Sequence, residues 1–137
     1  MPIRLFFIFL TTSFFLAGCA SYAMRDIGLD KLSPRKAEQE LSVGINDYEN
    51  GDYPAASINL QSALNDKLVF QADRVRAYKY LAFIDCSSER KRQCKDEFKK
   101  ALELDPAFEL TPAETGHPIW GPIFRSLKNA QNITEQK

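Results

Sequence analysis

The sequence contains a single histidine and only three cysteines among its 137 residues. One histidine is too few for a multi-histidine metal centre, and alone it cannot supply both the acid and the base of a proton-transfer reaction. An excess of one charge is also lacking, because 18 Lys and Arg residues balance 18 Asp and Glu residues. Nucleic-acid-binding domains concentrate excess basic residues on one face. We therefore expect no enzyme, no cofactor, no small-molecule substrate and no nucleic-acid partner.

A hydrophobic run long enough to span a membrane is missing as well. The longest largely apolar run lies near the start of the chain, from Leu5 to Leu16, interrupted only by Thr11, Thr12 and Ser13. Arg4 is the only charged residue before it. This run is about a dozen residues, whereas a helix that spans a bilayer needs roughly 20. Residues 1–18 are therefore expected to be a signal peptide, and the remainder of the protein is expected to be exported.

The residues directly after this run, Leu16-Ala17-Gly18-Cys19, resemble the lipobox of bacterial lipoproteins. In that family the signal peptide is removed before the cysteine, and acyl chains such as palmitate attach the cysteine to a membrane. The resemblance implies cleavage after Gly18 and lipidation of Cys19. Ala20 stands where inner-membrane lipoproteins carry aspartate, so the expected location is the outer membrane, facing the periplasm. The alternative is an ordinary signal peptide or an uncleaved anchor with a chance cysteine.

The remainder of the chain is patterned as pairs of helices. Residues 19–32 lack periodicity and are expected to form the lipidated N-terminus and a tether. Residues 33–110 contain four segments with apolar residues at helical spacing, and polar turns at 49–52 and 87–89 join them in pairs. The first expected helix has Ser33 as its N-cap and Pro34 as its first residue. The second and third are expected at roughly 53–65 and 70–86. The fourth is expected to contain Cys94, Phe98, Ala101 and Leu102. The fold class is therefore expected to be all-α.

The second helix pair repeats the first at a spacing of 38 residues. Small and large residues match in the pairs Gly44 and Ala82, Ala56 and Cys94, Leu60 and Phe98. Such alternation is typical of a helical solenoid, in which small residues allow helices to cross closely. The segments Tyr48 to Tyr53 and Leu104-Asp105-Pro106 resemble tetratricopeptide repeats. The resemblance implies a short α-solenoid of two helix hairpins, with four extra residues between them around 67–70.

Residues 111–137 are expected to form a loop and a capping helix, because two repeats alone rarely bury enough surface. Thr111 and Glu114 have the spacing of a capping box, and Pro122 permits a final helix. That helix is expected to start at about Ile119 or Pro122 and to reach Gln131. Its expected apolar residues are Ile123, Phe124 and Leu127. Trp120 is expected to pack against the second hairpin.

Two cysteines, Cys86 and Cys94, flank the second turn. In an oxidising compartment they can pair as the hairpin folds back, so we expect a disulfide. The alternative is two buried thiols. Neither a catalytic residue nor a metal ligand is expected, and His117 is interpreted as a loop residue that hydrogen-bonds to the backbone.

A surface for a protein partner is the expected functional site. By analogy with tetratricopeptide repeats, the first helix of each hairpin lines a concave face. The residues expected on this face are Glu38, Leu41, Ile45, Tyr48, Arg76, Lys79 and Phe83. The alternative is that Leu41, Ile45 and Phe83 belong partly to the core.

The combination of lipobox, repeats, the cysteine pair and the tail 116–122 resembles the small lipoproteins associated with bacterial type VI secretion systems. This resemblance implies an accessory or structural role in an envelope-spanning complex, with the membrane and secretion-system subunits as partners. The alternative is a general envelope scaffold for outer-membrane, pilus or peptidoglycan assembly. A third class, an enzyme such as a wall hydrolase, has little support from the residues present.

Overall fold

The computed structural model of the chain describes residues 35–135, and this range consists of six α-helices without a β-strand. The helices are α3 (Lys36–Glu49), α4 (Tyr53–Asn65), α5 (Gln71–Ser87), α6 (Lys91–Leu104), α7 (Pro112–Thr115) and α8 (Gly121–Glu135). The expected all-α class is therefore confirmed. The expected signal peptide, 1–18, and the tether, 19–32, lie outside the described residues, together with Gly18 and Cys19.

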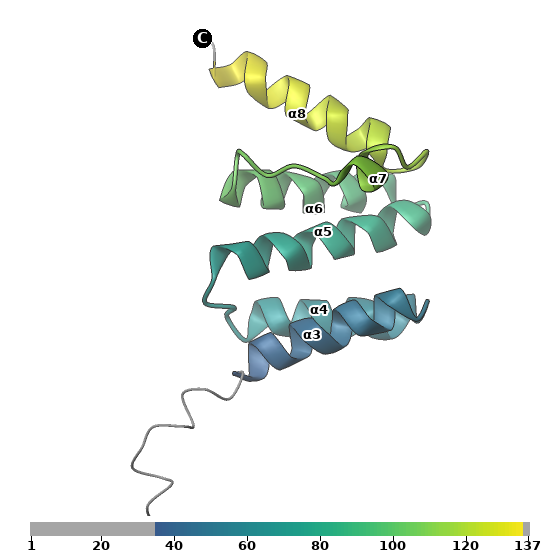
Figure 1. The fold of residues 1–137 in the computed structure, drawn as a ribbon, viewed down its shortest axis with the longest axis vertical. Coiled ribbons are helices and arrows are strands. Elements are labelled where there is room, and N and C mark those ends of the chain that lie inside the picture. The colour runs from purple at the N-terminus through teal and green to yellow at the C-terminus, as the bar shows by residue number, and fades with distance from the viewer. Residues whose placement is uncertain (1–34, 136–137) are drawn as a thin grey trace, which may run out of the picture. The chain divides into compact units, whose positions relative to one another are not determined.

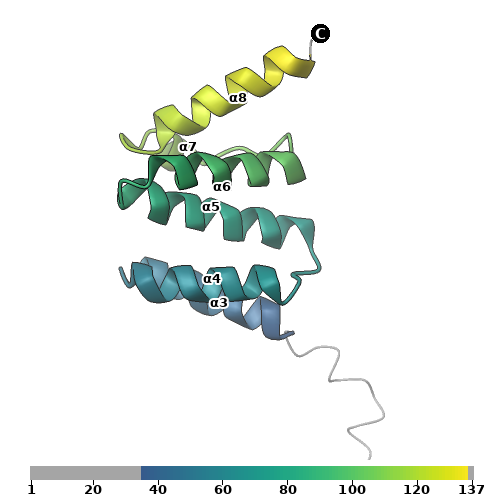
Figure 2. The same cartoon turned by 180° about the vertical axis from the view of Figure 1, so that it is seen from behind.

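The first four of these helices pair into two hairpins that lie side by side (Figures 1 and 2). α3 packs on α4, α5 packs on α6, and both α3 and α4 contact α5. α8 crosses over α6, and the short helix α7 contacts α8 (Figure 1). Within residues 35–135, no helix is both long enough and apolar enough to cross a membrane.

Small residues and the sequence of the turn explain why α3 and α4 form a closely packed hairpin. A Cβ atom added to Gly44 would lie 2.8 Å from Cγ of Leu60, so only glycine permits this crossing of α3 and α4. Gly51 has a φ of 81° in the turn, and the Asp52 carboxylate caps α4 by accepting a hydrogen bond from the backbone N–H of Ala55 at 3.1 Å. At its other end the hairpin starts later than predicted, because Arg35 has extended backbone angles and is the N-cap of α3.

Two clusters of buried residues form the interior. The first lies between α3, α4 and α5, and it includes Leu41, Ile45 and Leu60. The second lies between α5, α6, the segment 108–120 and α8. Tyr48 and Tyr80 are half-buried and pack against both clusters, so these two side chains connect the two interiors.

The C-terminal segment folds back over the second hairpin. Thr111 and Glu114 form the expected capping box at the start of α7. Phe124 of α8 makes an edge-to-face contact with Phe98 of α6, with ring centroids 5.2 Å apart. Trp120 stacks on Phe83 of α5 at a centroid distance of 4.4 Å, which confirms its expected packing against the second hairpin. The final helix starts at Gly121 and extends beyond the expected end, to Glu135.

Candidate protein-interaction surface

Three of the seven residues predicted to face a partner are buried. Leu41, Ile45 and Phe83 keep only 3%, 8% and 2% of their surface exposed. Leu41 and Ile45 belong to the first buried cluster, and Phe83 belongs to the second. The prediction is corrected for these three residues. Their helical spacing identifies an apolar face, and this face packs against neighbouring helices instead of remaining open.

The other four predicted residues retain some exposure but form no continuous set on their own. Arg76 is exposed on α5 and pairs with Asp73 on the same helix at 3.4 Å. Glu38 is half-buried on α3, in the first hairpin. Tyr48 and Lys79 both contact the ring of Tyr80, whereas Arg76 pairs within its own helix.

Tyr80, which was not among the predicted residues, connects Tyr48 with Lys79. The ring centroids of Tyr48 and Tyr80 lie 5.0 Å apart in an edge-to-face arrangement. The Lys79 Nζ atom lies 4.7 Å from the centroid of the Tyr80 ring, within the range of a cation–π contact. The sequence did not predict that Tyr80 belongs to this group, because its position in the helical pattern is equally compatible with a core residue.

Glu114 completes this group from a distant part of the chain. Its Oε1 atom lies 2.6 Å from the Lys79 Nζ atom, and its Oε2 atom accepts a hydrogen bond from the backbone N–H of Thr111 at 2.9 Å. The sequence predicted the capping role of Glu114 but not its ion pair with α5. We name the four residues Tyr48, Lys79, Tyr80 and Glu114 the Tyr48–Glu114 surface.

The electrostatics of the Tyr48–Glu114 surface follow from partial burial. Burial raises the pKa of Tyr48 to about 12, with smaller contributions from Tyr53, Tyr80 and the Glu114 carboxylate. Burial also acts to raise the pKa of Glu114, but the hydrogen bonds from Lys79 and Thr111 outweigh it, and the pKa lies below its ordinary value. At neutral pH the surface therefore presents a neutral phenol beside a paired carboxylate.

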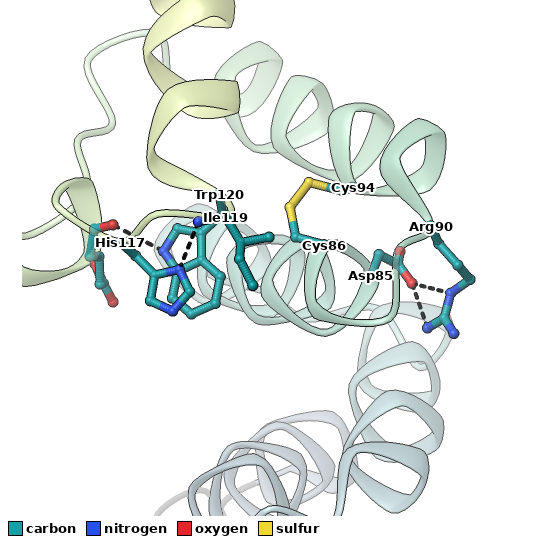
Figure 3. Close-up of a disulfide and its surroundings, with 8 residues drawn as sticks. Asp85, Cys86, Arg90, Cys94, His117, Ile119 and Trp120 are labelled. Atoms are coloured by element: carbon teal, nitrogen blue, oxygen red, sulfur yellow. Dashed lines mark hydrogen bonds and ion pairs between the residues drawn. A yellow bond between two sulfur atoms is a disulfide. The ribbon is translucent and has the colours of Figure 1, made fainter.

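Contacts of the aromatic rings of His117 and Trp120 fix the position of the segment that contains Glu114. The Trp120 Nε1–H group donates a hydrogen bond to the Glu114 carbonyl oxygen at 3.0 Å, and the His117 ring stacks on the Trp120 ring (Figure 3). His117 Nδ1 accepts a hydrogen bond from the backbone N–H of Ile119 at 3.3 Å. His117 is therefore a loop residue bonded to the backbone, as the sequence indicated.

The predicted disulfide is present. Cys86, near the end of α5, is bonded to Cys94 in the first turn of α6, and both residues are buried (Figure 3). Beside it, the Asp85 carboxylate accepts a hydrogen bond from the Arg90 Nε–H group at 2.8 Å and closes the same turn. The second hairpin is thus joined both covalently and by an ion pair.

Within residues 35–135, no three His, Cys, Asp or Glu side chains converge as metal ligands. The Tyr48–Glu114 surface combines two tyrosine rings with the Lys79–Glu114 ion pair, and tyrosine is enriched in protein interfaces. Comparisons of the chain with protein-family models, with curated proteins and with solved structures found no match.

Proposed function

We propose that this protein is a lipid-anchored scaffold that faces the periplasm and binds another protein of the bacterial cell envelope. Its two helix hairpins act as a short tetratricopeptide-like solenoid, and the C-terminal helix caps the open end. The role is non-enzymatic and needs no cofactor. The repeat of one hairpin geometry in the other is the observation that carries this proposal.

The two turns support the repeat by their hydrogen bonds. In the first turn the backbone N–H groups of Gly51 and Asp52 donate to the carbonyl oxygens of Tyr48 and Asp47. In the second turn the N–H groups of residues 89 and 90 donate to the carbonyl oxygens of residues 86 and 85. Each of these positions follows its counterpart by 38 residues. One backbone design therefore recurs in both hairpins.

The packing of equivalent side chains supports the same conclusion. All six members of the matched pairs are buried: Gly44 and Ala82, Ala56 and Cys94, Leu60 and Phe98. Stacked helical repeats of this kind generally present an extended surface for a protein partner rather than a catalytic pocket. The Tyr48–Glu114 surface spans both hairpins, which is where such a partner would contact them.

The membrane anchor is supported by the lipobox-like residues that end in Cys19. Several acyl chains on one cysteine bind a bilayer far more firmly than a single chain does. Together with the tail 116–122, the anchor favours an accessory role in a type VI secretion envelope complex. The alternative is a general envelope scaffold for outer-membrane, pilus or peptidoglycan assembly.

Crosslinking in intact membranes tests the proposed function. A photo-reactive residue at position 76 lies one helical turn from Tyr80, on α5, whereas one at the exposed Ile58 of α4 serves as the matched control. We expect position 76 to capture envelope-complex subunits and position 58 to capture far less. A Cys19→Ser form is expected to lose this capture because it is no longer anchored.

The identity of the captured proteins decides between the two pathways. Secretion-system subunits would support the type VI assignment, and deletion of the gene is then expected to abolish contractile secretion alone. Outer-membrane or wall-assembly proteins would replace that assignment with the general scaffold. Equal capture at positions 76 and 58 would contradict the proposed surface. Replacement of His117 by alanine is expected to preserve secretion, since no catalytic role is proposed.

A further inference from the structure

The loop between α4 and α5 exposes two adjacent apolar side chains. Val69 and Phe70 keep 50% and 63% of their surface in solvent. The neighbouring Leu68 is buried in the first core cluster and holds the loop against the hairpin. Val69 and Phe70 are therefore displayed by an anchored loop.

Two positions of this loop depart from the residues that local stability favours. Phe70 is the N-cap of α5 and provides no side-chain cap, although Ser, Thr, Asp or Asn is preferred there. Lys67 has a φ of 64°, in the left-handed region that favours glycine or asparagine. Lys67 is exposed, and within residues 35–135 it forms no ion pair that we observe. Segments that rest in a lipid interface likewise combine basic side chains with exposed apolar ones.

The position of the loop connects it with the membrane anchor. The Lys36 Nζ atom at the start of α3 lies 2.6 Å from the Asp66 Oδ2 atom, directly before the loop. Figures 1 and 2 both place the start of α3 and the α4–α5 connection at the same end of the hairpins. The chain therefore enters the described domain beside Val69 and Phe70.

The length of the chain before α3 limits how far the domain can move from a lipid on Cys19. Residues 20–34 separate Cys19 from Arg35, and a fully extended segment of this length reaches at most about 50 Å. A short tether keeps the loop close to the bilayer surface and so gives it a high effective concentration there. Even a weak contact between the loop and the lipid is then formed for much of the time.

We propose that Val69 and Phe70 insert into the headgroup region of the bilayer that holds the Cys19 lipid, while Lys67 contacts lipid phosphates. This inference rests on the lipid anchor of the proposed function. The contact orients the domain rather than anchoring it. Tyr48 lies near the other end of α3, about 18 Å along the helix axis from Lys36, so this part of the Tyr48–Glu114 surface lies at a distance from the bilayer contact.

A fluorescent probe at position 70 tests this contact in the mature, lipidated full chain. The Phe70→Cys variant carries an environment-sensitive thiol label, because Cys86 and Cys94 are paired and buried. The protein is reconstituted in vesicles of phosphatidylethanolamine and phosphatidylglycerol. We expect a blue-shifted emission that brominated lipids quench. An Ile58→Cys control, at a residue 66% exposed on α4, is expected to show neither effect.

The other outcomes overturn the contact in distinguishable ways. The mass of the N-terminal peptide reports lipidation separately. A lipidated chain whose label at position 70 stays in water contradicts the membrane contact but leaves the anchor intact, whereas a chain without lipid contradicts both. A blue shift that disappears when the protein is diluted with lipid identifies a second copy of the chain as the occupant. A Lys67→Glu change is expected to weaken the shift on anionic vesicles, and an unchanged shift removes Lys67 from the contact.

Discussion

Gly51 and Glu89 occupy equivalent positions in the two hairpin turns, and both have a left-handed backbone, with φ of 81° and 61°. Glycine adopts this conformation without steric cost, whereas the Cβ atom of glutamate makes it unfavourable. The second turn keeps the geometry despite an unsuitable residue. The Cys86–Cys94 disulfide and the Asp85–Arg90 ion pair both span this turn.

Glu89→Gly is expected to stabilise the protein, because it removes the strain of a left-handed glutamate. Such strain costs about 1 kcal/mol or more, partly offset by the greater chain entropy of glycine, so a net gain of about 0.5–1 kcal/mol is expected. Urea unfolding followed by circular dichroism measures the change. Glu89→Ala retains the Cβ atom and serves as the control. An equal gain from alanine would show that charge, not backbone strain, limits stability.

Gly44→Ala is expected to destabilise the first hairpin. The new Cβ atom would lie 2.8 Å from Leu60 Cγ and 3.0 Å from the Leu60 backbone nitrogen. Overpacking costs about 1–3 kcal/mol, and the helix propensity of alanine returns about 1 kcal/mol, so a net loss of about 1 kcal/mol is expected. Thermal unfolding measures this loss.

A double variant separates the clash from helix propensity. In a Leu60→Ala background the side chain that would meet the new Cβ atom is largely removed. Gly44→Ala is then expected to lose less stability, or to gain it, because propensity favours alanine. If the loss were unchanged in this background, contact with the Leu60 side chain could not be its cause.

Reduction of the Cys86–Cys94 disulfide is expected to lower the free energy of unfolding by about 2–3 kcal/mol, from the chain entropy of a loop this short. The two residues are separated by 8 positions in the sequence. Equilibrium unfolding with and without a reductant measures the difference. The double variant Cys86→Ala, Cys94→Ala is the control, since a reductant should leave it unaffected. A reductant effect on that variant would point to a cause other than the disulfide.

The Lys79–Glu114 ion pair is expected to make stability depend on pH in the acid range. The pKa of Glu114 is lowered in the folded state, so its contribution is present above the ordinary pKa of 4.5 and is lost as the pH falls through the folded value. At pH 7 we expect Glu114→Gln to cost about 1 kcal/mol.

The acid range provides the test of this pair. Below pH 4.5 the difference in unfolding free energy between the native chain and Glu114→Gln is expected to shrink as Glu114 becomes protonated. Glutamine can still accept the Thr111 hydrogen bond of the capping box, so the comparison isolates the charge. A difference that stays constant from pH 7 to low pH would contradict the role of the ion pair.

The pattern of the sequence was sufficient to predict the helices, the hairpins and the disulfide. Helical spacing of small and large residues, such as Gly44 and Leu60, is a local signal that does not depend on distant parts of the chain. Cys86 and Cys94 lie on either side of a short turn, so closure of the hairpin can bring them together. The start of α3 was predicted less well, because Ser33 and Arg35 are close enough for either to be the last residue before the helix.

The candidate surface was predicted less completely than the fold. Leu41, Ile45 and Phe83 share a helix face with residues that remain partly exposed, and periodicity alone does not tell which part of an apolar face is covered. The cover comes from packing with other helices and, at Phe83, from Trp120, which lies 4.4 Å away between ring centroids. That Tyr80 and Glu114 belong to this surface could be recognised only from their contacts in the folded structure.

The amino-acid sequence by itself determined the all-α class, the two hairpins, the covalent link between Cys86 and Cys94 and the lipobox-like residues around Cys19, because each depends on residues close together in the chain. Only the tertiary structure decided which side chains of α3 and α5 are core and which are accessible. It also decided that Glu114 meets Lys79 across 35 residues of sequence, at 2.6 Å. The physical reason is that burial and ion pairing depend on how the C-terminal segment packs over α5, which no local pattern specifies.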